Sequence, residues 1–302
     1  MILWLLRVVP VAALSSLPVG AAFSVGRAAA VSEVAGRRYT LLIAGLDRDP
    51  TSRDADRRSE GHTDALMLLT TELGTGNVQA LHIPRDSLVR QDGYVGRING
   101  VDLALGRRGL VRAVADLTGL SPDAVLVLDF ARFRRVVTVV GPVRMWVDRF
   151  VPSPEGDVSV ASGWRSLSAS PALAVVRFRH EPLGDIGRVH RQERFLRAAV
   201  ELASRLPRPA FMRALRLADP SFPPWAAGLA YAAVHPLCSY GAHSVPGGFG
   251  TGAQASYWLP DHAGARLQSL WMTHPQAAAP AFARWKERRG AAEVDDGRDR
   301  SH

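Results

Sequence analysis

The stretch "YTLLIAGLD", residues 39–47, is a continuous apolar run that ends in a glycine and an aspartate. Such a run is typical of a buried strand followed by a turn at Asp47. Two further apolar runs, "ALMLLTT" at 65–71 and "VQALHI" at 78–83, are also predicted to be strands. Each strand has a polar group at or near one end, and strand ends are where open α/β sheets bind ligands.

Helical and strand patterns alternate after the third run. Apolar residues at helical spacing predict a helix over 101–117 and a second one that stops at Gly141, while 124–128 and 143–147 have strand patterns. This interleaving predicts the α/β class. The arrangement that we expect for it is three layers, α/β/α, around a central mixed sheet. Beyond about Pro207 the signals weaken.

Composition restricts the class of partner. The chain has 302 residues, 47% of them hydrophobic, and a formal charge of +9. This charge favours an anionic partner, such as a nucleic acid, a membrane surface or a phosphorylated ligand. Lys286 is the only lysine, so the positive charge is almost all arginine, which a GC-rich coding bias would also produce. Cys238 is the only cysteine, which excludes an intrachain disulfide.

The N-terminus predicts membrane attachment. Residues 1–30 are apolar and small apart from arginines, and 8–25 is nearly long enough to cross a bilayer. We favour a retained single-pass transmembrane anchor over a cleaved signal peptide, for which Ala28 and Ala30 would supply the small residues of a cleavage site. One catalytic domain is expected over 39–275, and a charged, disordered tail over 287–302.

The segment "VVRFRHEPLGDIGRVHRQERFL", residues 175–196, concentrates arginines in a predicted strand, loop and helix. Side chains at i and i+2 of a strand share a face, and those at i, i+3 and i+4 of a helix share a side. The groups so formed are Arg177 with Arg179, and Arg188 with Arg191 and Gln192. Guanidinium groups near a helix N-terminus suit a phosphate. The alternative is surface ion pairing with Glu181, Asp185 and Glu193.

Carboxylates add a second kind of ligand. Asp47 follows the first strand and Asp64 precedes the second, so both are expected at one edge of the sheet. Together they would hold a hard cation such as Mg²⁺ beside a phosphate, although either alone is more often a turn or cap residue. Arg85 and Asp86 from "IPRDS" bring further charges to the same edge.

In combination these segments resemble the LytR-CpsA-Psr family of cell-wall glycopolymer transferases. The resemblance covers residues 39–205 well and 245–260 more weakly. Its segments, in order, are "LLIAGLD" (41–47), "HTDALMLLT" (62–70), "IPRDS" (83–87), "RINGVDLALG" (97–106), "LDFARFRRVVTVVGPVRMWV" (128–147) and the arginine-rich 175–196.

The resemblance implies a membrane-anchored phosphotransferase whose catalytic domain faces outward from the cell membrane. Such an enzyme moves a glycan phosphate from a polyprenyl-pyrophosphate carrier to peptidoglycan, with the lipid tail in an apolar tunnel. It would use Mg²⁺ and would not bind nucleic acid. By motif position, the metal ligands would be Asp47 and Asp64, the pyrophosphate ligands Arg85, Arg177, Arg179, Arg188 and Gln192, and the orienting residues Asp185 and Arg191.

One position departs from the family pattern. Where the family usually has Arg-x-Asp, this chain has His62-Thr63-Asp64. Histidine donates to phosphate but is mostly neutral at pH 7. One alternative function is a regulatory protein that binds prenyl pyrophosphate but has little turnover because of His62. Another is a polyprenyl-pyrophosphate hydrolase, in which water replaces the sugar hydroxyl. Asp86 and a metal-bound oxygen are the candidates for accepting the proton of the acceptor hydroxyl.

Overall fold

The computed structural model describes residues 36–48, 61–152, 158–178, 184–251 and 256–299. Its centre is a five-stranded sheet in the order β6-β1-β2-β3-β9. β1 is antiparallel to β2 and parallel to β6, while β3 is antiparallel to β2 and parallel to β9. The predicted mixed sheet is therefore confirmed. Its strands are β1 (Arg38–Leu46), β2 (Thr63–Glu72), β3 (Asn77–Ile83), β6 (Ala124–Leu128) and β9 (Ser239–Ser244).

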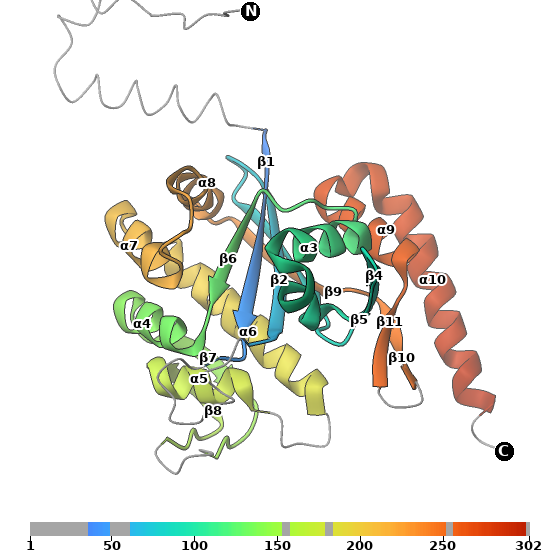
Figure 1. Cartoon of the computed structure of the whole chain (residues 1–302), viewed down its shortest axis with the longest axis horizontal. Coiled ribbons are helices and arrows are strands. Elements are labelled where there is room, and N and C mark those ends of the chain that lie inside the picture. The colour runs from blue at the N-terminus through green and yellow to red at the C-terminus, as the bar shows by residue number, and fades with distance from the viewer. Residues whose placement is uncertain (1–35, 49–60, 153–157, 179–183, 252–255, 300–302) are drawn as a thin grey trace, which may run out of the picture.

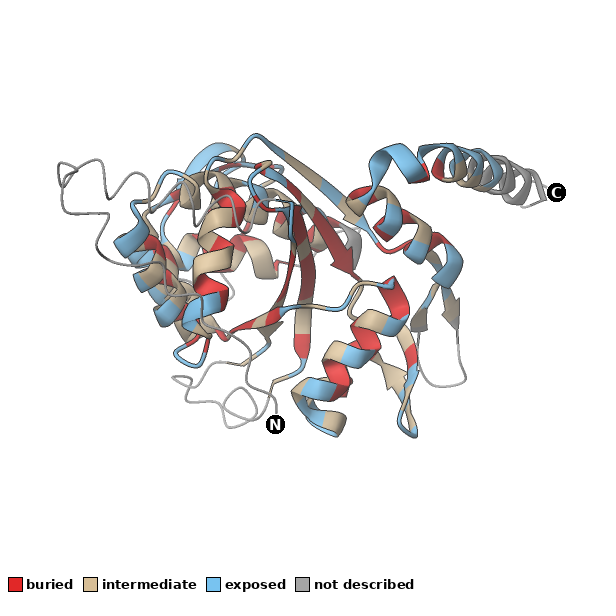
Figure 2. Ribbon diagram, turned by 90° about the horizontal axis from the view of Figure 1, so that it is seen from above, coloured by how far each residue is buried: buried red, intermediate tan, exposed pale blue. Residues whose placement is uncertain are grey.

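Helices cover both faces of this sheet, which gives three layers (Figure 1). Successive side chains of a strand point to opposite faces. Leu42 and Ala44 of β1 therefore pack in one core with α3 and α9, while Tyr39 and Leu41 pack in another with α6, α7 and α8. The buried strands run between the two helix layers in Figure 2. These helices are α3 (Val101–Thr118), α6 (Gly184–Ala203), α7 (Arg208–Ala218), α8 (Pro224–Val234) and α9 (His262–Thr273).

Smaller elements surround the sheet. α4 begins after Asp129, whose side chain accepts a hydrogen bond from the Arg132 N–H (2.7 Å), and it ends at Gly141, which has a φ of 105°. Within the described ranges, three hairpins lie outside the main sheet, β4–β5, β7–β8 and β10–β11. The bounds are β4 (Leu88–Gln91), β5 (Tyr94–Arg97), η2 (Ile98–Gly100), α4 (Phe130–Val140), β7 (Val143–Val147), β8 (Gly163–Leu167), α5 (Ala169–Arg177), β10 (Gly247–Thr251), β11 (Ser256–Pro260) and α10 (Pro275–Asp299).

One prediction of local structure was wrong. The strand expected to aim Arg177 and Arg179 together is instead the end of helix α5, with Phe178 as its C-cap. That helix starts after Ser168, tolerates Pro171 in its first turn, and buries Ala172 and Val175. Helix α10 continues to Asp299, through the first part of the segment for which a disordered tail is expected, and the disorder of that tail stays a prediction.

The predicted anchor, residues 1–30, lies outside the described residues. Among the helices that the structure does describe, none combines the length and the apolar character needed to cross a membrane.

Candidate active site

Three strands bring charged residues to one edge of the sheet. β1 ends just before Asp47, β2 begins beside Asp64, and β3 ends just before Arg85. Because β2 is antiparallel to both neighbours, its first residues lie at the same edge as the last residues of β1 and β3. Asp47 and His62 are exposed there, and the Asp47 N–H donates to the His62 carbonyl oxygen (2.9 Å). The sequence prediction of a shared edge is confirmed.

Asp64 is the centre of this edge. Arg85 Nη1 lies 2.6 Å from Asp64 Oδ2, and Arg188 Nη1 reaches within 3.9 Å of the same oxygen from helix α6. The other oxygen, Oδ1, accepts a hydrogen bond from Asn99 Nδ2 (3.3 Å). The Asn99 side chain was not among the predicted site residues, although "RINGVDLALG" contains it. The Asn99 carbonyl oxygen accepts a hydrogen bond from Thr63 Oγ1 (3.2 Å), and the Asn99 backbone N–H donates to the Arg85 carbonyl oxygen (3.2 Å).

Asp86 lies between two guanidinium groups. Its carboxylate is 3.6 Å from Arg85 Nε and 3.2 Å from Arg97 Nε. Its carbonyl oxygen accepts the Trp258 backbone N–H (3.0 Å), which ties the β10–β11 hairpin to the site. Arg97, at the end of β5, was missed by the sequence reasoning because it is brought here only by pairing with β4. Two positive charges thus lie beside the Asp86 carboxylate, which is one of the candidate proton acceptors.

The polar residues near the start of α6 turn inward but reach different partners. Arg188 is 2% exposed and faces Asp64. Arg191 is fully buried: its Nη2 donates to the Phe178 carbonyl oxygen (2.7 Å) and its Nη1 lies 3.4 Å from Asp148. Gln192 Nε2 donates to the Val176 carbonyl oxygen (3.2 Å). Arg191 thus ties the end of α5 to α6 through Phe178, and it ties the end of β7 to α6 through Asp148, a partner that the sequence reasoning did not identify.

Of the remaining predicted site residues, the structure describes the side chain of Arg177 but not those of Arg179 and Asp185. Arg177 lies at the C-terminal end of α5, with its guanidinium carbon 4.2 Å from the centre of the Phe130 ring. Arg179 and the side chain of Asp185 lie outside the described residues. The structure therefore brings together Asp64, Arg85, Asp86 and Arg188, whereas Arg191 and Gln192 hold backbone carbonyls in this state. The roles given to all of these residues stay predictions.

Burial and neighbouring charges perturb several titratable groups. Burial, followed by the charges of Arg188 and His190, lowers the pKa of His82 on β3 to about 3, so its imidazole is neutral near pH 7. Burial also raises the pKa of Glu193, which accepts a hydrogen bond from Ser244 (3.1 Å). Burial acts to raise the pKa of Asp148 too, but its own backbone N–H and the Arg191 and Arg194 guanidiniums outweigh this and hold the pKa below its usual value.

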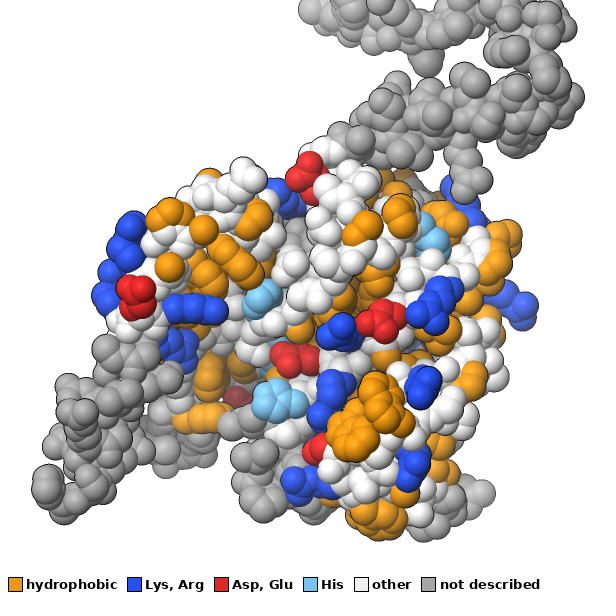
Figure 3. Space-filling model, turned by 180° about the vertical axis from the view of Figure 1, so that it is seen from behind, with side chains coloured by type: hydrophobic (Ala, Val, Ile, Leu, Met, Phe, Trp, Pro, Cys, Tyr) orange, Lys and Arg blue, Asp and Glu red, His pale blue; other side chains and the backbone are white. Residues whose placement is uncertain are grey.

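One face of the molecule is shown in Figure 3. Lys and Arg side chains are spread across it, and Asp, Glu and His side chains gather near its middle, around a hollow in which hydrophobic side chains are visible. Acidic and basic groups thus lie next to apolar surface, a combination suited to a ligand with a charged group and an apolar part.

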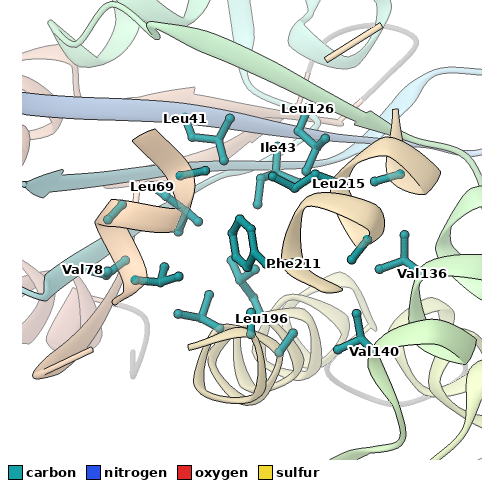
Figure 4. Close-up of a pocket in the computed structure, with 18 of the residues that line it drawn as sticks. Leu41, Ile43, Leu69, Val78, Leu126, Val136, Val140, Leu196, Phe211 and Leu215 are labelled. Atoms are coloured by element: carbon teal, nitrogen blue, oxygen red, sulfur yellow. The ribbon is translucent and has the colours of Figure 1, made fainter. Parts of the chain in front are cut away.

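An apolar cavity of about 200 Å³ lies between the sheet and the helices α6, α7 and α8 that cover one of its faces. Side chains from strands and helices point into it from several directions (Figure 4). α6 contributes residues about two turns beyond Arg188, so one helix connects the charged edge to the cavity. Among the lining residues are Leu41, Ile43, Leu69, Val78, Leu126, Val136, Val140, Leu196, Ala199, Phe211, Leu215 and Ala230.

The charged edge fits a cation only if a ligand shares it. Mg²⁺ is commonly held by one or two carboxylates together with phosphate oxygens and water. Asp47 and Asp64 are such carboxylates at one edge, but Asp64 already interacts with Arg85 and Asn99. Within the part of the chain that the structure describes, no three His, Cys, Asp or Glu side chains are grouped to hold a metal by themselves. Any Mg²⁺ here would therefore depend on a bound phosphate.

The family comparison agrees with the order of these motifs. The LytR_cpsA_psr family model matches residues 23–208. The chain belongs to the LytR-CpsA-Psr family. It is 29% identical over 167 residues to the cell wall biosynthesis protein LcpA of Corynebacterium glutamicum, a match that covers 46% of this chain and 32% of LcpA. The chain therefore spans about a third of that relative's length.

Solved structures of this family share the fold. TagV of B. subtilis has a TM-score of 0.65 and 21% identity, covering 79% of this chain and 98% of TagV. The TagT structure with bound octaprenyl pyrophosphate lipid has a TM-score of 0.59 and 20% identity, covering 79% of this chain and 91% of TagT. TagT bound to LIIa-WTA has a TM-score of 0.63 and 20% identity, covering 78% and 90%. At this identity the likeness establishes the fold.

Proposed function

We propose that this protein is a membrane-anchored phosphotransferase that moves a glycan phosphate from a polyprenyl-pyrophosphate carrier to peptidoglycan on the extracytoplasmic face of the cell membrane. One observation carries the proposal: helix α6 presents Arg188 to the Asp64 edge and, two turns later, Leu196 to the apolar cavity. A ligand with an anionic head and an apolar tail matches both ends of that helix. TagT, a member of the same family, binds octaprenyl pyrophosphate.

The arginines would act through charge and geometry. Guanidinium groups pair with phosphate oxygens in two parallel hydrogen bonds, and phosphoryl transfer depends mainly on positioning and on neutralising charge spread over the oxygens. Arg85, which follows β3, and Arg188 of α6 both lie close to the Asp64 carboxylate. A pyrophosphate bound there would replace part of the Asp64 ion pairs with ion pairs between these arginines and its own oxygens. Arg177 and Arg179 would also contact it, and Gln192 and His62 are further candidates.

The proposed reaction is a balanced displacement. An acceptor hydroxyl oxygen of peptidoglycan forms a bond to the phosphorus nearest the glycan, and the bond from that phosphorus to the bridging oxygen breaks. Polyprenyl phosphate leaves, and the hydroxyl proton passes to a base, for which Asp86 is one candidate. Mg²⁺, held by Asp47 and Asp64 with the phosphates, would neutralise charge on the pyrophosphate when bound. No external energy source is required, because the pyrophosphate linkage is itself activated.

The test is transfer by the full-length protein in detergent, using a synthetic polyprenyl-pyrophosphate disaccharide, peptidoglycan fragments and MgCl₂. Asp64→Asn should lower the rate about 10² to 10³-fold, as loss of a preorganised charged group does. Asp92→Asn is the matched control, because Asp92 lies in the exposed turn after β4 and pairs only with Arg112 in the described contacts. Absence of transfer by the wild type, or a full rate for Asp64→Asn, would overturn the proposal.

His62 supports a second candidate, a prenyl-pyrophosphate binder with little turnover. It stands exposed beside Asp47, where the family usually has an arginine. If the wild type is such a binder, His62→Arg should raise the transfer rate greatly while lipid binding stays unchanged. If the wild type is a competent transferase, the same change should alter the rate by less than about tenfold. A hydrolase would instead release free glycan phosphate without an acceptor.

A further inference from the structure

The outer face of the β7–β8 hairpin exposes two tryptophans side by side. In the antiparallel register Trp146 lies directly opposite Trp164, so both side chains point to the same face. They are 46% and 59% exposed, and Phe150, which follows shortly after the end of β7, is 57% exposed. Large apolar side chains grouped at a surface indicate a binding site more often than isolated ones do.

The opposite face of the same hairpin packs against the protein core. Val143, Met145 and Val147 alternate with the outward residues of β7 and are buried, and Met145 and Val147 belong to a core with Leu167 and Val175. The two tryptophans are not part of that core.

The outer face combines exposed aromatic rings with a cation. The rings of Trp146 and Trp164 lie 6.1 Å apart between centroids, at an angle of 73°. The Arg144 guanidinium carbon lies 5.4 Å from the centre of the Trp164 ring. This face therefore offers both apolar ring surface and a positive charge to a ligand.

This hairpin is fixed to the helix that carries the candidate active site. β7 packs against α6, and Asp148, directly after β7, is 2.8 Å from Arg194 Nη2 and 3.4 Å from Arg191 Nη1. Arg191 is one turn from Arg188, which faces Asp64. A ligand group on the hairpin would therefore be held on the same rigid support as the charged edge.

We propose that the outer face of the β7–β8 hairpin binds an anionic glycan chain. The C–H faces of sugar rings pack against exposed aromatic rings, whose faces carry partial negative charge. Arg144 would pair with a phosphate or carboxylate of the same chain, because guanidinium matches the geometry of both groups. This inference deepens the proposed function and rests on it, since the chain bound here would be the glycan of the lipid-linked donor.

The position of the hairpin favours a glycan over a lipid surface. β1 starts at Arg38, and the β7–β8 hairpin lies beyond the opposite end of that strand (Figure 1). Nine strand residues span about 30 Å, whereas residues 31–37 extend at most about 25 Å from the proposed anchor. The anchor would thus hold the start of β1 near the bilayer and leave the hairpin facing away from it.

The experiment measures binding of the full-length protein in detergent to yeast phosphomannan, by retardation in affinity gels and by calorimetry. Unphosphorylated mannan and phosphatidylglycerol vesicles are the comparison probes. The Trp146→Ala/Trp164→Ala variant should bind phosphomannan about tenfold or more weakly, as the loss of central aromatic contacts does. Trp225→Ala is the matched control, because Trp225 is 55% exposed on α8 and should not affect binding. Trp164→Tyr, which keeps an aromatic ring, should retain most of the affinity.

Three outcomes would overturn the inference: equal binding by the wild type and the double variant, an equal loss in Trp225→Ala, or loss of vesicle binding in place of phosphomannan binding. The last result would identify a membrane-docking surface. Thermal unfolding confirms that the variants are folded. Copurifying polyprenyl lipid should be the same in the wild type and the double variant. If no such lipid is found in either but phosphomannan binding still depends on the tryptophans, the proposed function fails and the glycan site stands.

Discussion

The two faces of the central sheet are built from the same strands but are packed differently. On the side of α3 and α9, Leu42, Leu68 and Leu81 are fully buried in a continuous core. On the side of α6, α7 and α8, Leu41 and Leu69 border a cavity of about 200 Å³. Neighbouring residues of one strand thus face a filled core and an empty space. Apolar composition alone does not decide whether a core is filled, since the cavity side is equally apolar.

The largest expected effect compares two adjacent leucines of β2. Leu68→Ala should lower the free energy of unfolding by about 3 kcal/mol, because it removes a fully buried side chain from a filled core. Leu69→Ala should lower it by only about 1 kcal/mol, because part of that side chain already borders empty space. Urea unfolding of both variants measures the difference. Equal losses would mean that the cavity side is packed as tightly as the other.

An intermediate effect comes from adding volume to each side. Ala113→Leu on α3 should lower the free energy of unfolding by about 2 kcal/mol, because Ala113 lies in the filled core. Ala230→Leu on α8 should change it by less than about 1 kcal/mol, because the new side chain enters the cavity. Thermal and urea unfolding test both. A strongly destabilised Ala230→Leu would show that the cavity cannot accept a side chain.

A further effect concerns pH. The pKa of His82 is lowered to about 3, whereas in the unfolded chain it would be about 6.5, so the unfolded state binds more protons between these values. The stability due to neutral His82 is therefore present above pH 6.5 and is lost as pH falls, by up to about 1.4 kcal/mol for each pH unit. His82→Gln should flatten the dependence of unfolding free energy on pH between pH 7 and about 4.5.

Local patterns predicted the parts of the fold that depend on neighbouring residues. The apolar runs of β1, β2, β3 and β6 were recognised because burial on both faces gives a strand a continuous hydrophobic sequence. β9 was missed, because "SYGAHS" has no such run and becomes a strand through its pairing with β3. The four residues "VRFR" fitted a strand by alternation, but the helix that begins at Ala169 continues through Arg177.

The candidate site was predictable where strand ends determine position. Asp64 and Arg85 meet because their strands are neighbours in the sheet. Asn99 and Asp148 were not predicted, since each reaches its partner across at least 35 residues of sequence through packing that no local pattern encodes. The cavity residues could not be selected either, because a cavity depends on what the covering helices leave unfilled.

The most direct test of the central claim is mass spectrometry of lipid that copurifies with the membrane-extracted full-length protein. The wild type and the control Trp225→Ala should carry a polyprenyl phosphate or pyrophosphate. Ala230→Leu, which fills the cavity, and Arg177→Ala/Arg179→Ala, which removes two of the proposed pyrophosphate ligands, should both lose it while remaining folded. Absence of such a lipid from the folded wild type, or equal retention by all four proteins, would contradict the central claim. That claim is that the protein binds the anionic head of a lipid at the charged edge and its tail in the cavity.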